Sequence, residues 1–365
     1  MLAKAPAQTL QQSTLNPSAH TRESGAVDTV ERAYPANSTS IQSSGRASAD
    51  PVSSLFSPET MSMRARFLML SATLLGLAGP MAAVVAPTVA FAQSAAVAVA
   101  PQYDTTHVYV GPADVDRFVQ SFTATFGGQS TPQVVVNVLP VPSSTTSQLI
   151  QTPVGTVSLF GFKTPIPRPF GDERNGYLVK DMDVAIKEAR QAGADVIVSD
   201  FPDPIGRDAV VQWPGGVNMQ LYWHTKVPNY APFQTVPENR VYVSNDRAAA
   251  FVKAFLAFSH GKIVSDDKKA SGAEIGRTDA TYHRIRIESA FGKMVVLATD
   301  GHLPYPFGHD NTGYEVSSLQ DTLAKAKAAG VNVIVEPFTS AGRTAAIVEF
   351  PGGYVAEIHQ TAAAG

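Results

Sequence analysis

The sequence predicts an α+β protein in which one module of strands and helices occurs twice in tandem. Residues 167–179 and 304–316 share the pattern Pro-x-Pro-Phe-Gly-x-x-x-x-Gly-Tyr-x-Val, and both are followed by a Val-Ile-Val segment and a Pro-Gly-Gly turn. Pro167 and Pro304 are 137 residues apart, and so are Pro214 and Pro351. A fixed offset over several motifs in the same order indicates a repeated structural unit.

Each copy is expected to contain two βαβββ units. Residues 114–126 carry apolar side chains at helical spacing, and residues 181–192 form a second expected helix that starts at Asp181 and stops at Gly193. The expected strands of the first copy cover residues 107–110, 133–138, 148–151, 156–162, 176–179, 195–198, 209–213 and 217–223. The second copy repeats this order, so we expect modules at 104–225 and 238–360 and a Pro-spaced linker at 226–237.

The region before the modules differs in composition. Residues 1–60 are rich in Ser, Ala, Thr, Pro and Gln without periodicity, which predicts disorder. Residues 61–92 have the order of a secretory signal peptide, with Arg64 and Arg66 before an apolar run and Ala90-Phe-Ala92 after it. An uncleaved membrane anchor is the alternative.

Two consequences follow for the mature protein. We expect a periplasmic or secreted chain that begins near Gln93 and has no stable membrane insertion after signal cleavage. Signal peptides begin at the N-terminus, so we also expect translation to start at Met61 or Met63, in which case residues 1–60 are not translated.

Composition narrows the classes of function. A formal net charge of −3 argues against nucleic acid as a partner. The chain has no cysteine, which excludes disulfides, thiolate nucleophiles and Cys-based metal centres.

The order of elements resembles the vicinal oxygen chelate superfamily, which includes glyoxalases, bleomycin-resistance proteins and extradiol dioxygenases. The likeness is strongest in the second half of each copy, where a Tyr-x-Val strand is followed by a helix ending in Ala-Gly, a Val-Ile-Val strand and Pro-Gly-Gly. It implies that the paired βαβββ units of each module form a curved mixed sheet around a cup-shaped cavity.

Enzymes of this family hold one divalent metal in the cup, which binds two neighbouring substrate oxygens. The resemblance assigns ligand positions to the first strand, the strand closing the first unit, the start of the second unit and the last strand. The candidates there are Thr105 or His107, Ser158 or Phe160, Arg174 and Gln220 in the first copy, and Glu238 or Arg240, Val295 or Leu297, Asn311 and Glu357 in the second. Neither copy assembles two imidazoles with two carboxamides or carboxylates, so we expect a degenerate metal site.

Glu357 and His359 are the candidate catalytic residues. They share one strand face because side chains alternate with period two. The pair could transfer a proton, or Glu357 could bind a metal together with His309; zinc, iron, nickel and manganese all suit such ligands. A solvated C-terminal strand is the alternative interpretation.

Five further residues are candidates for ligand binding. His107 and Tyr109 alternate on the first strand, and Gln220 lies on the last strand of the first copy. Arg207 and Arg343 each follow a glycine, where a guanidinium can bind a carboxylate or phosphate. Structural contacts explain the same residues equally well.

Two hypotheses about function remain. The first is an exported glyoxalase/bleomycin-resistance-like protein that binds a small molecule in a cup-shaped cavity. The second is a metal-dependent lyase or dioxygenase of the same fold. Incomplete ligand sets and aromatic residues favour the first, whereas His302, His309, Glu357 and His359 favour the second.

Overall fold

The computed structural model describes residues 97–138 and 141–362. The predictions for residues 1–60 and for the signal peptide at 61–92 fall outside this part of the chain. Within it, no helix has both the length and the apolar character required to cross a membrane.

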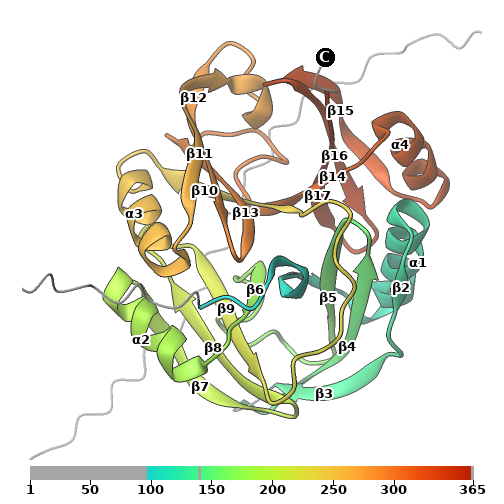
Figure 1. Ribbon diagram of the computed structural model, residues 1–365. Coiled ribbons are helices and arrows are strands. Elements are labelled where there is room, and N and C mark those ends of the chain that lie inside the picture. The colour runs from blue at the N-terminus through green and yellow to red at the C-terminus, as the bar shows by residue number, and fades with distance from the viewer. Residues whose placement is uncertain (1–96, 139–140, 363–365) are drawn as a thin grey trace, which may run out of the picture. The chain divides into compact units, whose positions relative to one another are not determined.

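The first module is built on a nine-stranded mixed sheet (Figure 1). Its strands are β1 (Thr105–Val110), β2 (Gln129–Ser130), β3 (Val134–Val138), β4 (Ser143–Thr152), β5 (Gly155–Phe162), β6 (Asn175–Leu178), β7 (Asp195–Asp203), β8 (Gly206–Gln212) and β9 (Asn218–His224). The strand order is β2-β4-β5-β1-β6-β9-β8-β7, with β3 also paired to β4. The parallel pairs are β1 with β5 and β6 with β9, as two βαβββ units side by side require.

The second module repeats this order in an eight-stranded sheet. Its strands are β10 (Glu238–Ser244), β11 (Lys262–Ser271), β12 (Thr281–Ser289), β13 (Gly292–Thr299), β14 (Asn311–Glu315), β15 (Asn332–Ser340), β16 (Arg343–Phe350) and β17 (Tyr354–Thr361). The order β12-β13-β10-β14-β17-β16-β15 matches β4-β5-β1-β6-β9-β8-β7 strand for strand. The predicted fold class, two tandem modules of paired βαβββ units, is therefore confirmed.

Each unit contributes one helix: α1 (Val115–Phe126), α2 (Met182–Ala192), α3 (Ala248–Ser259) and α4 (Leu319–Ala328). Asp181 accepts a hydrogen bond from the backbone N–H of Val184, which caps α2. Gly193 follows with φ of 101°, a conformation that favours glycine and ends the helix there. Three short 3₁₀ turns, at Pro101–Tyr103, Pro112–Asp114 and Gly272–Ile275, complete the elements.

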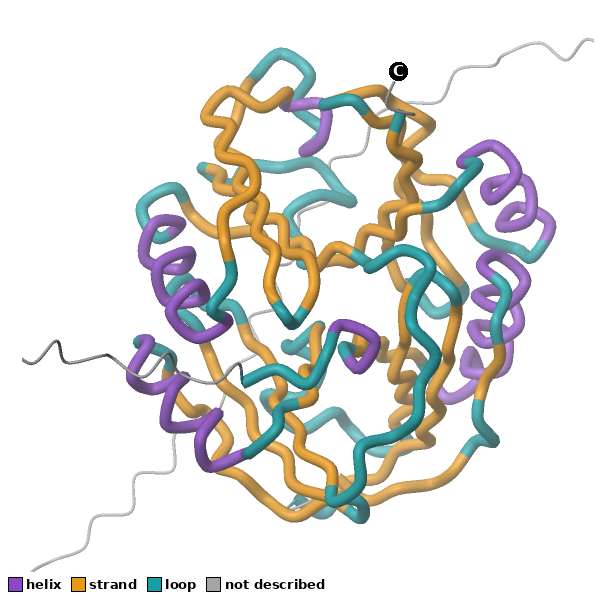
Figure 2. The backbone as a smooth tube through the Cα atoms, in the orientation of Figure 1, coloured by secondary structure: helices purple, strands orange, loops and turns teal. Residues whose placement is uncertain are grey.

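The two modules share their cores. Figure 1 shows α1 beside α4 and α2 beside α3, and Figure 2 shows the same helices outside the strands. Phe122 of α1 lies 5.1 Å from Phe350 of β16 between ring centroids, and Trp213 lies 5.1 Å from Phe258 of α3. Each helix pair thus buries apolar side chains from both halves of the chain, so neither module has a complete core of its own.

Candidate functional sites in the two cups

A glycine at the centre of each sheet lets polar side chains converge. Gly176 of β6 lies opposite Thr105 and Gln220, and Gly313 of β14 lies opposite Glu238 and Glu357. A Cβ atom on Gly176 would lie 2.7 Å from His107 Nε2, 2.9 Å from Thr105 Oγ1 and 2.9 Å from Tyr222 Cε1. These distances leave no room for a side chain, so the glycine is what allows the neighbouring strands' side chains to meet.

The strand pairing fixes which residues are equivalent in the two cups. The positions of Thr105, His107, Gln220 and Tyr222 in the first module correspond to those of Glu238, Arg240, Glu357 and His359 in the second. The first cup thus has no carboxylate or guanidinium at these four positions. The second cup has two carboxylates and one guanidinium at the equivalent positions. The two cups therefore differ in chemistry although they share a fold.

In the second cup, charged side chains form a buried network. Arg240 Nη2 lies 3.0 Å from Glu357 Oε2, and Arg343 Nη1 donates a 2.8 Å hydrogen bond to Glu238 Oε2. Arg240 Nη1 also lies 3.6 Å from Glu238 Oε2, and Arg343 Nη2 lies 3.5 Å from Glu357 Oε1. The side chains of Arg240 and Glu357 are each 1% exposed, so water cannot solvate these charges.

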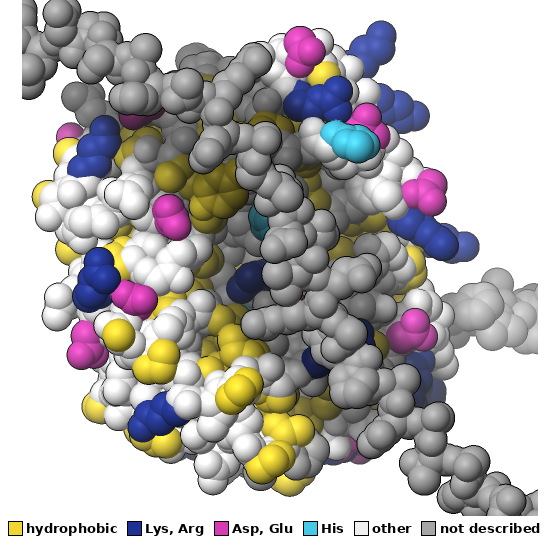
Figure 3. Space-filling model, turned by 180° about the vertical axis from the view of Figure 1, so that it is seen from behind, with side chains coloured by type: hydrophobic (Ala, Val, Ile, Leu, Met, Phe, Trp, Pro, Cys, Tyr) yellow, Lys and Arg dark blue, Asp and Glu magenta, His cyan; other side chains and the backbone are white. Residues whose placement is uncertain are grey.

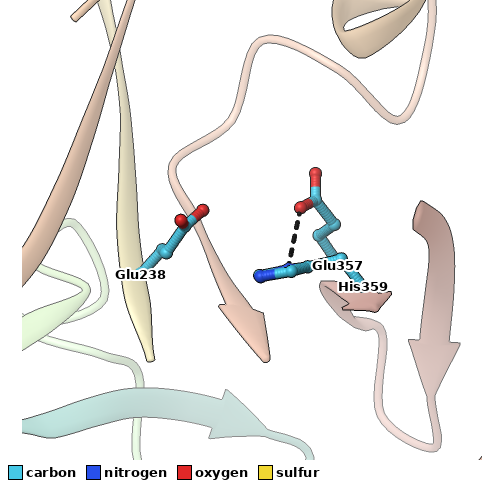
Figure 4. Close-up of side chains that lie close together, drawn as sticks. All are labelled: Glu238, Glu357 and His359. Atoms are coloured by element: carbon cyan, nitrogen blue, oxygen red, sulfur yellow. Dashed lines mark ion pairs between the residues drawn. The ribbon is translucent and has the colours of Figure 1, made fainter. Parts of the chain in front are cut away.

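His359 joins this network. Its Nδ1 lies 3.2 Å from Glu357 Oε1, and Figure 4 shows Glu238 from β10 facing Glu357 and His359 of β17. The predicted pairing of Glu357 with His359 on one strand face is therefore observed. Both side chains are buried within the network.

A second layer of charge surrounds this network. Glu274 pairs with Arg284, accepts a 2.5 Å hydrogen bond from Tyr282 and a 2.8 Å hydrogen bond from Ser340. The half-buried Arg286 lies nearby, and burial is the main cause that lowers its pKa. Three buried carboxylates thus face three paired guanidinium groups, at Arg240, Arg284 and Arg343.

The guanidinium groups keep the carboxylates ionised. Burial alone would raise the pKa of Glu238, but Arg343, His359 and Arg240 outweigh it and hold the pKa at about 2. Burial likewise opposes ionisation of Glu357, yet Arg240 and Arg343 lower its pKa below the usual value. Burial disfavours the charged form of Arg240, and Glu357 and Glu238 overcome this and raise its pKa.

Within the part of the chain that the structure describes, Glu238, Glu357 and His359 form a group that could hold a metal ion. Their ligand atoms lie within 4.8 Å of one another. Both carboxylates, however, already bind guanidinium groups, and their two negative charges are balanced by Arg240 and Arg343. A divalent cation would add two charges to a neutral buried network, so the observed arrangement does not fit a metal ion.

His309, the other proposed metal ligand, lies outside this group. It is exposed and lines a shallow hollow with His302, Ser244 and Asp300. Asp310, next to it in sequence, accepts a 2.8 Å hydrogen bond from the backbone N–H of Tyr242.

The two arginines that follow glycine have different environments. Gly206 pairs with Asp203 at the turn between β7 and β8. Arg343 pairs with Ser340 at the same place in the turn between β15 and β16, so Arg343 is the counterpart of Gly206. The Gly-Arg match in the sequence is therefore one residue out of register in the structure. A shift of one residue changes the sheet face, and Arg207 accordingly pairs with Asp183 and Asp200 at the surface while Arg343 enters the cup.

The first cup contains a cavity of about 340 Å³. Aromatic rings form much of its wall: Tyr109 stacks on Phe160 at 5.2 Å and on Phe162 at 6.0 Å. Tyr103 and Tyr230, whose ring centroids are 5.5 Å apart, line another part, so the linker contributes to the enclosure. Of the predicted ligand-binding residues, His107, Tyr109 and Gln220 line this cavity.

Buried polar groups in this cavity include atoms without partners. His107 is 3% exposed and its Nδ1 has no hydrogen-bond partner, and the same holds for His224 Nδ1. The hydroxyl of Tyr109 donates a hydrogen bond to the fully buried Glu173, and burial followed by Glu173 raises the pKa of Tyr109. Buried polar atoms that lack partners are costly unless something binds to them.

Four polar groups in or beside this cavity were not predicted from the sequence: Glu173, Asp203, Asp208 and His224. Only period-two alternation along β9, where Gln220, Tyr222 and His224 share a face, could have indicated the last of them. The burial of Asp208, with Asp203 adding to it, raises the Asp208 pKa to about 7 against an opposing hydrogen bond from Gln220.

Comparison with known proteins places this geometry in a fold family. No family model matches the chain, and no curated protein matches it by sequence. A mutant of 4-hydroxymandelate synthase from Streptomyces coelicolor has a similar structure, with a TM-score of 0.50 and 12% identity over 73% of this chain and 93% of that one. The Mn(II)-bound glyoxalase from Novosphingobium aromaticivorans gives a TM-score of 0.44 and 15% identity over 73% of this chain and 83% of that one.

Both proteins belong to the vicinal oxygen chelate superfamily, and the likeness to the synthase shows that this chain has the same fold. The resemblance predicted from the sequence is confirmed at this level.

We predict that Glu357→Gln destabilises the protein by about 3–5 kcal/mol, because it leaves two buried guanidinium groups without full neutralisation. Urea denaturation measures the free energy of unfolding. Asp200→Asn is the control, since it removes a carboxylate from a partly exposed ion pair and should cost at most about 1 kcal/mol. Equal effects of the two substitutions would show that the buried network does not stabilise the fold.

A second prediction concerns Asp208 and pH. The folded chain retains this proton up to about pH 7, whereas the unfolded chain releases it near 3.8. The folded state thus binds more protons in between, and this group's contribution to stability falls as pH rises through that window. Asp208→Asn should therefore stabilise the protein by roughly 1–3 kcal/mol at pH 8 and have little effect at pH 3. Urea denaturation at both pH values tests this, and a pH-independent effect would contradict it.

Proposed function

We propose that the protein is an exported binding protein that holds a small organic molecule in the cup of its first module. The observation that carries this proposal is the cavity of about 340 Å³, which has an aromatic wall and contains buried imidazole nitrogens that make no hydrogen bond. Its volume lies within the range of small-molecule sites, which are mostly apolar with a few polar groups.

The contrast between the two cups supports a division of roles. At equivalent positions, the first cup has Thr105, His107 and Gln220 where the second has Glu238, Arg240 and Glu357. The charged side chains of the second cup form ion pairs with one another and are buried. We infer that the second module supports the structure and that the first binds the ligand.

The surface is consistent with a small-molecule partner. On the face seen in Figure 3, positive and negative side chains are interspersed with hydrophobic ones. Together with the formal net charge of −3, this mixed surface does not favour nucleic acid.

A metal-dependent lyase or dioxygenase is the second candidate, and the group of Glu238, Glu357 and His359 favours it. This function requires that Arg240 and Arg343 leave the carboxylates. Titration with Zn²⁺, Mn²⁺, Fe²⁺ and Ni²⁺ under anaerobic conditions decides between the two. Micromolar binding that Glu357→Gln weakens at least tenfold would favour the enzyme.

We predict that the purified mature protein binds N-phenyl-1-naphthylamine, an uncharged aromatic probe, and that Ser158→Trp abolishes binding. Ser158 lines the cavity opposite His107 in the β1–β5 pairing, so an indole there fills the space. Calorimetry measures the binding. Lys187→Trp, on an exposed position of α2, is the control and should bind like the unmutated protein. Binding that survives Ser158→Trp would contradict a site in this cup.

Export is tested separately. We expect the mature protein to begin near Gln93 and to appear in the periplasmic or extracellular fraction, because Arg64 and Arg66 precede an apolar run that ends at Ala90-Phe-Ala92. Cell fractionation and intact-mass measurement check both points. A full-length chain in the cytosol would refute export.

A further inference from the structure

The polar wall of the first cavity contains two carboxyl groups. Asp203 at the end of β7 and Asp208 on β8 both line it, on either side of a tight turn. The residues that line this cavity include neither lysine nor arginine. The nearest arginine in sequence, Arg207, faces the outer surface and is engaged by Asp183 and Asp200.

This acidic wall is specific to the first module. The strand pairing makes Ser340 the counterpart of Asp203 and Ala345 the counterpart of Asp208. The second cup instead contains arginines that neutralise its carboxylates. The wall of the first cup thus has two carboxyl groups and neither lysine nor arginine among its lining residues, so burial disfavours their ionised forms and a bound cation would stabilise those forms.

Other features of the same cavity indicate a binding site. His107 is 3% exposed, its Nδ1 atom lies 3.8 Å from Glu173 Oε1, and this nitrogen makes no hydrogen bond. The stacked rings of Tyr109, Phe160 and Phe162 offer flat apolar surface and also attract cations through their π electrons.

We propose, building on the function proposed above, that the ligand of the first cup is an organic cation: a protonated amine or amidinium on a flat apolar body. Its charge lies against Asp203 and Asp208, beside His224. Its body packs on the aromatic wall formed by Tyr109, Phe160 and Phe162. Ligand binding thereby supplies the positive charge that arginine supplies in the second cup.

The electrostatics of the wall agree with this assignment. Burial, with Asp203 second, raises the pKa of Asp208 to about 7, and burial raises the pKa of Asp203. The groups that face them are the backbone N–H of Ile205 and the side chains of Gln220, Tyr222 and His224 on β9. A cation favours the ionised carboxylates, so its affinity should rise as pH increases from 6 to 8.

The test uses three indoles that share one ring system and differ in charge: tryptamine, tryptophol and indole-3-propionate. Calorimetry at pH 8 should give at least tenfold tighter binding for the cation tryptamine than for neutral tryptophol, and the weakest binding for the anion. Asp203→Asn/Asp208→Asn should weaken tryptamine binding at least tenfold and leave tryptophol binding unchanged. Asp200→Asn, which removes an outer carboxylate of β7, is the matched control and should change neither.

The outcomes separate this inference from the proposed function. If tryptophol binds as tightly as tryptamine, or if the double variant retains tryptamine affinity, the cationic ligand is refuted while a binding cup remains. Tryptamine binding that persists in Ser158→Trp would place the cation elsewhere and overturn the assignment. If none of the indoles binds, the inference fails; if N-phenyl-1-naphthylamine also fails to bind, the binding function fails with it.

Discussion

A buried ionisable group either has a counterion or shifts its pKa towards the neutral form, and this constraint distinguishes the two halves of the molecule. Arg240 is 1% exposed and can remain ionised there because Glu357 lies 3.0 Å away. Arg343 meets the same requirement through Glu238. The carboxylates of the second cup are thus neutralised by arginines of the same cup, without a ligand. The first cup has carboxylates on its wall and no such counterions among the residues that line it.

The shared scaffold makes this contrast informative. Gly176 and Gly313 occupy equivalent places. In both modules the two strands beside the glycine, β1 and β9 or β10 and β17, bring their side chains together over it. What differs is the set of residues there. Side-chain identity rather than backbone geometry therefore decides whether a cup contains ion pairs or a cavity. A similar fold alone does not indicate the same chemistry.

The sequence was a good guide to the fold because its signals are local. The signals for helices act within a few residues: hydrophobic periodicity, Asp181 at a helix start and Gly193 at a helix end. The repeat shows the same order of elements a second time. The site depends on tertiary proximity instead. Asp203 and Asp208 flank one turn, but only the folded sheet brings them into the same cavity as His107, and no spacing in the sequence indicates that. The Gly-Arg repeat misled for a related reason, since the turn pairing makes Gly206, not Arg207, the counterpart of Arg343.

The packing between the modules shows how the second module supports the strands that form the cavity of the first. The helix pairs α1 with α4 and α2 with α3 bury apolar side chains from both halves, so the strands that form the open cavity rest on a core that the second module completes. A cavity lowers local packing and costs stability. The second module contains no such cost at the positions of its buried ion pairs, and it contributes apolar side chains to both shared cores. Duplication within one chain thereby allows one copy to contain a cavity while the other completes the core on which its strands rest.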